Sequence, residues 1–201
     1  MADPRLIDLS EDALPPQDDG DGENAFYFDP VDPEAWLVAE RILTTLGAPA
    51  AWIPVALPSP NRLGADELTA IAQERGLLTV KPPASWLGSE TINSHEALLA
   101  TTFARQAGKT VAFALALMRQ CWCGGRDLAD RNTVLLAGAA AEIHPNALEK
   151  AFGLKSLAAE LERATASAVD FGVTSLPTIR IGTELFTEDS GLDEAAEALR
   201  S

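Results

Sequence analysis

The stretch Tyr27-Phe-Asp-Pro-Val-Asp-Pro-Glu-Ala-Trp36 contains the end of one predicted element and the beginning of the next. The apolar run 25–28 ends at an Asp-Pro pair and is typical of a short strand. Asp32 is a good helix N-cap, and Pro33 suits the first helical position because its missing N–H would have had no partner there. The stretch therefore predicts a strand that turns directly into a helix.

On the C-terminal side of this stretch, the sequence predicts the rest of the helix and a second strand. Apolar side chains recur at helical spacing from Trp36 to Leu46, and Gly47 is a common type of helix end. The segment 51–57 is largely apolar and is predicted to be a strand. Pro54 within it indicates a strand at the edge of the sheet or one with a bulge.

The rest of the chain is first helical and then returns to strands. Strand patterns reappear at 178–181 and 184–186, a two-residue turn joins them, and a closing helix is expected at about 190–200. The order β-α-β, helices, β-β-α predicts an α/β fold whose sheet is completed across a large all-helical insertion. The expected helices of the insertion lie at about 65–75, 94–106, 108–122, 132–142, 145–153 and 155–170.

These elements predict three parts of the chain. Residues 1–24 hold eight acids and one base without any period, and they are predicted to be a disordered acidic tail. Residues 25–61 and 172–201 are expected to form the domain that contains the sheet. Residues 62–171 are expected to form the inserted helical domain.

Charge and hydropathy exclude several kinds of partner. The formal net charge of -15 repels polyanions, so we expect no nucleic-acid partner. The longest apolar run, 111–118, is far shorter than the ~18 residues that span a bilayer, and no secretory signal is visible. We therefore expect a soluble cytoplasmic protein without a membrane partner.

The two cysteines, Cys121 and Cys123, are expected to be reduced thiols in that compartment. On a helix, positions i and i+2 point about 200° apart, so they do not easily form one disulfide or share one metal ion. No cluster of His or Cys completes a zinc set, and we expect no metal. The favoured interpretation is a pair of buried structural thiols.

Four strings, in order, resemble the DsbA-like thioredoxin-fold family, in its branch of 2-hydroxychromene-2-carboxylate isomerases and kappa-class glutathione transferases. Residues 27–36 resemble the isomerases' first strand and active-site turn, and residues 121–130 resemble Y-W-x-E-G-R-D-I-x-D. Residues 172–178 resemble the cis-proline loop G-V-x-G-V-P-T, and residues 184–189 resemble the E-L-F-x-G-x-D that follows it. The resemblance implies a thioredoxin fold with a helical insertion.

The resemblance places the chemistry at the start of the first helix. DsbA-like enzymes carry Cys-x-x-Cys there, but this chain has Asp32-Pro33-Glu34-Ala35, so we do not expect dithiol exchange. The isomerases place a serine at the position of Asp32, and its hydroxyl is thought to bond the thiol of glutathione. A carboxylate would repel a thiolate, and two interpretations of Asp32 stay open: a plain N-cap or a catalytic general base.

Residues near the C-terminus are implied to hold a thiol cofactor. Pro177 is predicted to follow a cis bond, and the backbone of Leu176 is predicted to pair with an extended thiol peptide. Asp189 matches an acid that contacts the γ-glutamyl end of glutathione in relatives, and Ser190 stands where an arginine often follows. As alternatives, Pro177 begins a strand, and Asp189 or Ser190 caps the last helix.

The resemblance also implies a substrate cleft lined by Pro33, Asn93 and Trp122, although Trp122 is equally typical of a packed core. The favoured function is an isomerase or transferase that uses glutathione or another low-molecular-weight thiol on a small hydrophobic electrophile. One alternative is a non-catalytic binding module of the same fold. The other is a DsbA-like thiol-disulfide oxidoreductase that uses Cys121 or Cys123. A small-molecule ligand and, by family analogy, a homodimer are expected.

Overall fold

The computed structural model describes residues 23–57, 63–87 and 93–200. The predicted acidic tail lies outside these ranges except for its last two residues, of which Asn24 begins the sheet. No helix in the described ranges is long and apolar enough to cross a membrane.

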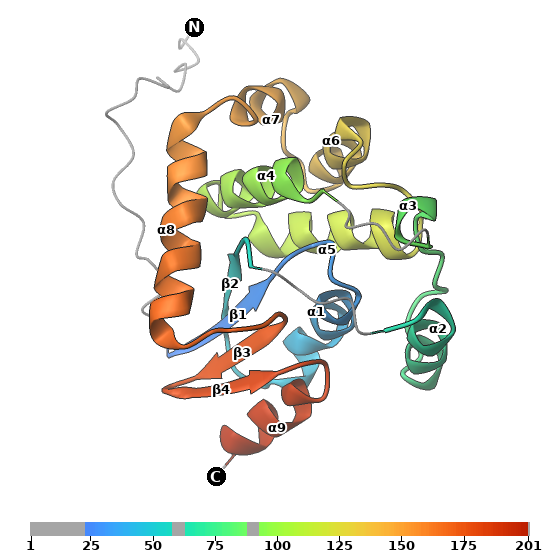
Figure 1. The fold of residues 1–201 in the computed structure, drawn as a ribbon, viewed down its shortest axis with the longest axis vertical. Helices are drawn as coiled ribbons and strands as arrows, with labels where there is room; N and C mark the ends of the chain where they lie inside the picture. The colour runs from blue at the N-terminus through green and yellow to red at the C-terminus, as the bar shows by residue number, and fades with distance from the viewer. Residues whose placement is uncertain (1–22, 58–62, 88–92, 201) are drawn as a thin grey trace, which may run out of the picture.

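Four strands form one mixed sheet in the order β2-β1-β3-β4 (Figure 1). The central β1 (Asn24–Phe28) pairs in parallel with β2 (Ala51–Pro54) and antiparallel with β3 (Thr178–Ile181). β4 (Glu184–Thr187) pairs antiparallel with β3 across the predicted two-residue turn. β2 is an edge strand, which confirms the position that Pro54 indicates.

Helices are the other regular elements of the described chain, and they follow the predicted order. α1 (Pro33–Thr45) connects β1 to β2, and α9 (Gly191–Ala198) follows β4. The single-turn α3, which the sequence does not predict, is an addition to the expected insertion. The helices between β2 and β3 are α2 (Ala65–Glu74), α3 (Ala84–Leu87), α4 (His95–Gln106), α5 (Thr110–Trp122), α6 (Arg131–Ala140), α7 (Pro145–Ala151) and α8 (Lys155–Phe171).

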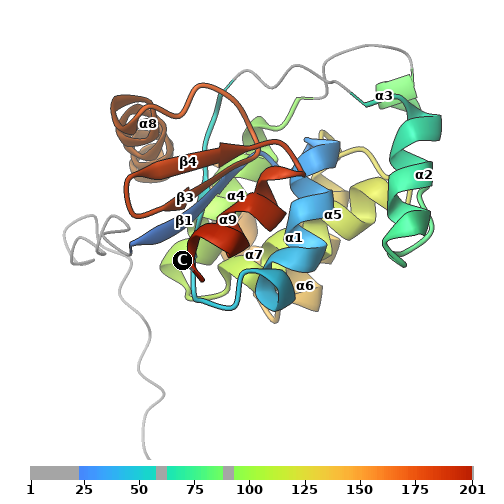
Figure 2. The same cartoon turned by 90° about the horizontal axis from the view of Figure 1, so that it is seen from below.

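Different helices cover the two faces of the sheet. On one face the rings of Phe26 and Phe28 stack 5.0 Å apart, Trp52 meets both edge-on, and this group packs on α1 and α5. Alternate residues of a strand point to opposite faces, so Tyr27 instead packs in a second cluster with Ala168 of α8. Figure 2 shows α8 on one side of the sheet and α1 and α9 on the other.

α8 belongs to both the helical region and the sheet. Near its start, Leu157 clusters with Leu98 of α4, whereas Ala168 near its end packs against the sheet. The proposed boundary between 62–171 and 172–201 therefore falls just after a helix that contacts both parts. The division into two domains stays a prediction.

Candidate active site

The register of the sheet brings two segments together at the end of β1. Tyr27 pairs with Thr178, so the residues after Tyr27 and those before Thr178 lie side by side (Figure 1). The bond between Leu176 and Pro177, just before Thr178, is cis, as the sequence predicts. The turn from β1 into α1 and the loop before β3 therefore form one site.

Asp32 caps the start of α1. Its Oδ1 accepts hydrogen bonds from the backbone N–H of Glu34 at 2.8 Å and of Ala35 at 3.2 Å, and the residue is only 5% exposed. Pro33 is the first helical residue and is buried. The N-cap interpretation of Asp32 is confirmed. A catalytic role for Asp32 stays a prediction.

The loop from β4 to α9 ties the cis bond to the first turn of α1. The N–H of Glu188 donates to the carbonyl oxygen of Pro177 at 3.2 Å. The N–H of the next residue, Asp189, donates to Oε2 of the buried Glu34 at 3.3 Å. Leu176 is buried in the cluster between the sheet and α8. Two adjacent amides thus hold the loop before β3 and the start of α1 at fixed positions.

The carboxylate of Asp189 is paired with two arginines that the sequence does not single out. Its Oδ1 lies 3.5 Å from Nη1 of Arg41 on α1, and its Oδ2 pairs with Nη1 of Arg75 at the end of α2. Ser190 occupies the N-cap position of α9 and is exposed, but its side chain makes no capping hydrogen bond. Ser190 is thus the N-cap residue of the last helix, as the alternative expects, although it caps without its side chain. A cofactor-binding role for Asp189 and Ser190 stays a prediction.

Asp29 is another residue of this site that sequence reasoning missed. The side chain follows β1 directly and is 6% exposed. Its Oδ1 accepts from the N–H of Val31 at 3.0 Å, and its Oδ2 accepts from the hydroxyl of Ser94 at 2.8 Å. Burial raises the pKa of the Asp29 carboxyl to about 6, against the lowering effect of both hydrogen bonds. Its position in the Tyr-Phe-Asp string was the available signal.

Asn93 and Ser94, at the start of α4, lie near the turn between β1 and α1. Ser94 is the N-cap residue of α4 but makes no capping hydrogen bond. The side-chain oxygen of the exposed Asn93 accepts from the N–H of His95 at 3.0 Å. Since Ser94 bonds to Asp29, the predicted cleft residue Asn93 lies near the turn that begins α1.

Trp122 is a core residue. It is fully buried, and its ring meets that of Trp86 edge to face with centroids 5.3 Å apart. The indole N–H groups of both tryptophans are buried and have no hydrogen-bond partner among the described residues. The packing interpretation of Trp122 is confirmed, and its place in a substrate cleft stays a prediction.

The cysteines are poor nucleophiles. Cys121 is fully buried, Cys123 is partly buried, and neither forms a disulfide. Burial, helped by the negative charges of Asp127 and Asp29, raises the pKa of Cys121 far above its usual range, and burial raises the pKa of Cys123 to about 11. Both thiols are therefore protonated at neutral pH. In the described part of the chain, no group of His, Cys, Asp and Glu is arranged to hold a metal ion.

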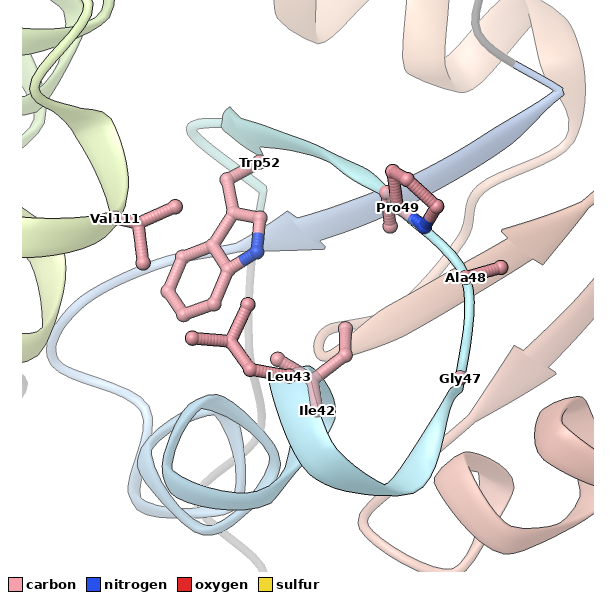
Figure 3. Close-up of a pocket in the computed structure, with 8 residues that line it drawn as sticks. Ile42, Leu43, Gly47, Ala48, Pro49, Trp52 and Val111 are labelled. Atoms are coloured by element: carbon pink, nitrogen blue, oxygen red, sulfur yellow. The ribbon is translucent and has the colours of Figure 1, made fainter.

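An apolar hollow of about 450 Å³ lies at the other end of α1 (Figure 3). Trp52, Ile42 and Leu43 face one another across it, and Val111 of α5 closes one side. Ile42 lies ten residues after Asp32, so about 15 Å of helix separates this hollow from Asp32. The hollow is therefore not part of the site at the start of α1.

Solved structures share this fold at low sequence identity. A 2-hydroxychromene-2-carboxylate isomerase matches with a TM-score of 0.75 and 16% identity, covering 88% of this chain and 94% of that chain. A probable DsbA oxidoreductase from Streptomyces coelicolor matches with a TM-score of 0.72 and 14% identity over 88% and 87% of the two chains. The cytosolic disulfide reductase DsbM from Pseudomonas aeruginosa matches with a TM-score of 0.62 and 18% identity over 88% and 96%.

No protein-family model matches the sequence, and no curated protein matches it. The structural neighbours confirm the predicted DsbA-like thioredoxin fold with its helical insertion. The DsbM structure has also been solved with GSH.

Proposed function

We propose that this chain with a DsbA-like thioredoxin fold is an isomerase or transferase that works on a small hydrophobic electrophile with a bound low-molecular-weight thiol, such as glutathione. One observation carries the proposal. The start of α1, the cis Leu176–Pro177 bond and the loop at Asp189 are held together, yet Asp32, Pro33 and Glu34 stand where a reactive thiol would be. A thiol reaction at this place needs a thiol from outside the chain.

The chain's own thiols do not favour the oxidoreductase alternative. Cys121 is buried, and its raised pKa leaves almost no thiolate at neutral pH. Cys123 is more accessible, but its pKa of about 11 leaves only a small thiolate fraction as well. Thiolate attack on a disulfide is slow when the thiolate is this scarce.

Backbone groups at the site suit an extended thiol peptide. In the proposed mode, the backbone of Leu176 pairs with the peptide as an added strand would, and its thiol lies near the positive end of α1. The DsbM neighbour, which shares the fold, is described with GSH. We expect Asn93 and Trp122 to border the space that the electrophile enters.

The ion pairs of Asp189 determine whether the loop between β4 and α9 would bind an amino group or a carboxylate of the thiol cofactor. An unpaired aspartate would attract an amino group, but here two guanidinium groups surround the carboxylate. The side chains of Arg41 and Arg75 keep 18% and 24% of their surface exposed. Since Asp193 also pairs with Arg41, we expect a carboxylate of the thiol, and not its amine, to bind at Arg75 beside Asp189 and Ser190.

A second candidate, a non-catalytic binding module, is favoured by the Asp32 cap. The N–H groups of Glu34 and Ala35 point to a carboxylate of the same chain. At an uncapped helix start, such groups would be available to stabilise a thiolate. A protein with an intact peptide-binding edge, whose first α1 N–H groups are occupied by the Asp32 cap, would bind a ligand without catalysing its reaction.

Titration calorimetry with glutathione separates these candidates when it is combined with an activity assay. Binding together with conjugation of a chlorodinitrobenzene electrophile or isomerisation of an aromatic enone supports the enzyme. Binding without turnover favours the module, and no heat at millimolar glutathione contradicts both thiol-binding proposals. Insulin reduction with dithiothreitol should be no faster than with the variant in which Cys121 and Cys123 are both serine.

A further inference from the structure

Ser94 occupies a helix N-cap position without capping the helix. Serine is favoured at N-caps because its oxygen accepts from backbone N–H groups of the first turn. At the start of the 12-residue α4, the side chain of Ser94 makes no such bond. Its hydroxyl instead donates to Oδ2 of Asp29 at 2.8 Å, across 65 residues of sequence. The hydrogen bond to Asp29, and not a capping bond to α4, therefore positions the hydroxyl of Ser94.

Asp29 connects this hydroxyl to the turn that begins α1. Its backbone carbonyl oxygen accepts from the N–H of Asp32 at 3.0 Å, and its Oδ1 accepts from the N–H of Val31. The turn therefore fixes the backbone of Asp29 through Asp32 and one carboxylate oxygen through Val31, while the other carboxylate oxygen holds Ser94. Ser94 is partly exposed, whereas Asp29 is buried. A ligand at the start of α1 would meet the hydroxyl first.

We propose that Ser94 is the residue that contacts the sulfur of the bound thiol, and that Asp29 positions Ser94 and accepts its proton. This inference rests on the proposed function. The S–H bond of the thiol breaks, and its proton moves to Oγ of Ser94. The original hydroxyl proton of Ser94 moves to Oδ2 of Asp29. The products are a thiolate that accepts a hydrogen bond from Ser94 and a neutral carboxylic acid at Asp29, with no change in total charge.

The groups around Asp29 fit this proton transfer. Cys121 faces it from α5 as a neutral thiol, because burial raises the pKa of that thiol. On its own turn, the Asp32 carboxylate is engaged by the first N–H groups of α1. Since the pKa of Asp29 is about 6, its carboxylate is largely ionised at neutral pH and can accept a proton. Below that pH, Asp29 already carries a proton and the transfer stops.

The test measures the ultraviolet absorbance of the thiolate of bound glutathione from about pH 5 to about pH 9, together with calorimetry and conjugation rates. The variants are Ser94→Ala, Ser94→Thr and Asp29→Asn, and Ser156→Ala is the control because Ser156 is an exposed serine at the start of α8. We expect Ser94→Ala to bind glutathione within about threefold of the parent while kcat falls at least about tenfold. Ser94→Thr, which keeps the hydroxyl, should restore much of the thiolate signal.

The conjugation rate of the parent protein should rise as the pH rises through about 6, where Asp29 ionises, and Asp29→Asn should lose this step. A Ser94→Ala variant with the same thiolate titration and rate as Ser156→Ala would overturn the role of Ser94 and leave the proposed function standing. Absence of glutathione binding in the parent protein would instead remove the proposed function and this inference with it.

Discussion

The starts of α1 and α4 meet at Asp29, but their N-cap residues behave differently. Asp32 uses its carboxylate to bond the first N–H groups of its own helix. Ser94 leaves the first turn of α4 without a side-chain cap and gives its hydroxyl to Asp29. Capping satisfies backbone donors and stabilises a helix, whereas a bond to a buried carboxylate stabilises a charge. The difference indicates that α1 begins with a structural residue and α4 with a polar group available for chemistry.

The largest expected effect concerns the ion pairs by which Asp189 joins the loop after β4 to α1 and α2. Asp189→Ala removes the carboxylate that pairs with Arg41 and Arg75. Arg41 keeps its pair with Asp193, whereas the partly buried guanidinium group of Arg75 loses the ion pair with Asp189. Breaking such a pair from one side typically costs about 3–5 kcal/mol. We expect a loss of about 3 kcal/mol in the free energy of unfolding, because both arginines keep some solvent contact. Urea denaturation measures it.

Asp193→Ala is the matched control for this variant. Asp193 pairs with the same Arg41 at 2.8 Å, but its side chain is 57% exposed. Exposed ion pairs are worth about 0–1 kcal/mol, so this loss should be much smaller. Equal losses in the two variants would show that the ion pairs of Asp189 stabilise the fold no more than an exposed pair does.

The next variant, Asp29→Asn, is expected to stabilise the protein. It tests whether the buried Asp29 carboxylate, which accepts the hydrogen bond from Ser94, lowers the stability of the fold. The pKa of Asp29 is about 6 in the folded protein and about 3.9 in an unfolded chain. Between these values the folded state binds more protons, so stability falls as the pH rises through this window. Ionised Asp29 therefore costs at most about 3 kcal/mol. Asp29→Asn should stabilise the protein by about 1–2 kcal/mol near neutral pH and by almost nothing near pH 3.5.

Denaturation at several pH values, with Asp127→Asn as the control, measures this effect. The Oδ1 of Asp127 also accepts an N–H two residues along the chain, from Ala129, but the residue is only half-buried. We expect a smaller gain for this variant than for Asp29→Asn, because less of the Asp127 side chain is buried. A uniform loss of stability for Asp29→Asn at all pH values would identify Asp29 as an ordinary turn residue.

A smaller effect is expected for Ser94→Ala. The variant removes one donor from a buried carboxylate, so we expect a loss of about 1–2 kcal/mol where Asp29 is ionised. Near pH 4 the loss should shrink, because Asp29 is then protonated. In the Asp29→Asn background the loss should largely disappear, which a double-mutant cycle measures. A loss that is independent of Asp29 would mean that Ser94 serves its own helix after all.

Local signals were sufficient for most of the fold. The Asp32-Pro33 pair predicts the start of α1, Pro54 predicts an edge strand, and the Gly182-Thr183 turn predicts the hairpin of β3 and β4. Each signal acts within a few residues, so it can be seen without the fold. The double role of α8 was not visible, because Leu157 and Ala168 belong to one apolar stripe although they pack on different partners.

The site was less predictable because its contacts join distant parts of the chain. The Asp32 cap follows from a local pattern, and the cis bond at Pro177 follows from the family resemblance. The bond from Ser94 to Asp29 spans 65 residues, and the hydrogen bond from Arg41 to Asp189 spans 148. The local sequence does not show that the N-cap residue Ser94 makes no capping hydrogen bond. Its hydroxyl bonds to Asp29 because the fold places that distant carboxylate beside it.

The smallest expected effect returns to the cap itself. Asp32→Ala leaves the N–H groups of Glu34 and Ala35 without this acceptor, and cap deletions of this kind cost about 1 kcal/mol. Asp130→Ala is the control, because Asp130 caps α6 with one bond to Asn132 and is exposed. We expect Asp32→Ala to lose at least as much stability in urea denaturation as Asp130→Ala, and to keep glutathione binding. If Asp32→Ala loses no stability while Asp130→Ala does, Asp32 is not needed as a cap, and its carboxylate is again a candidate for the chemistry assigned to Ser94.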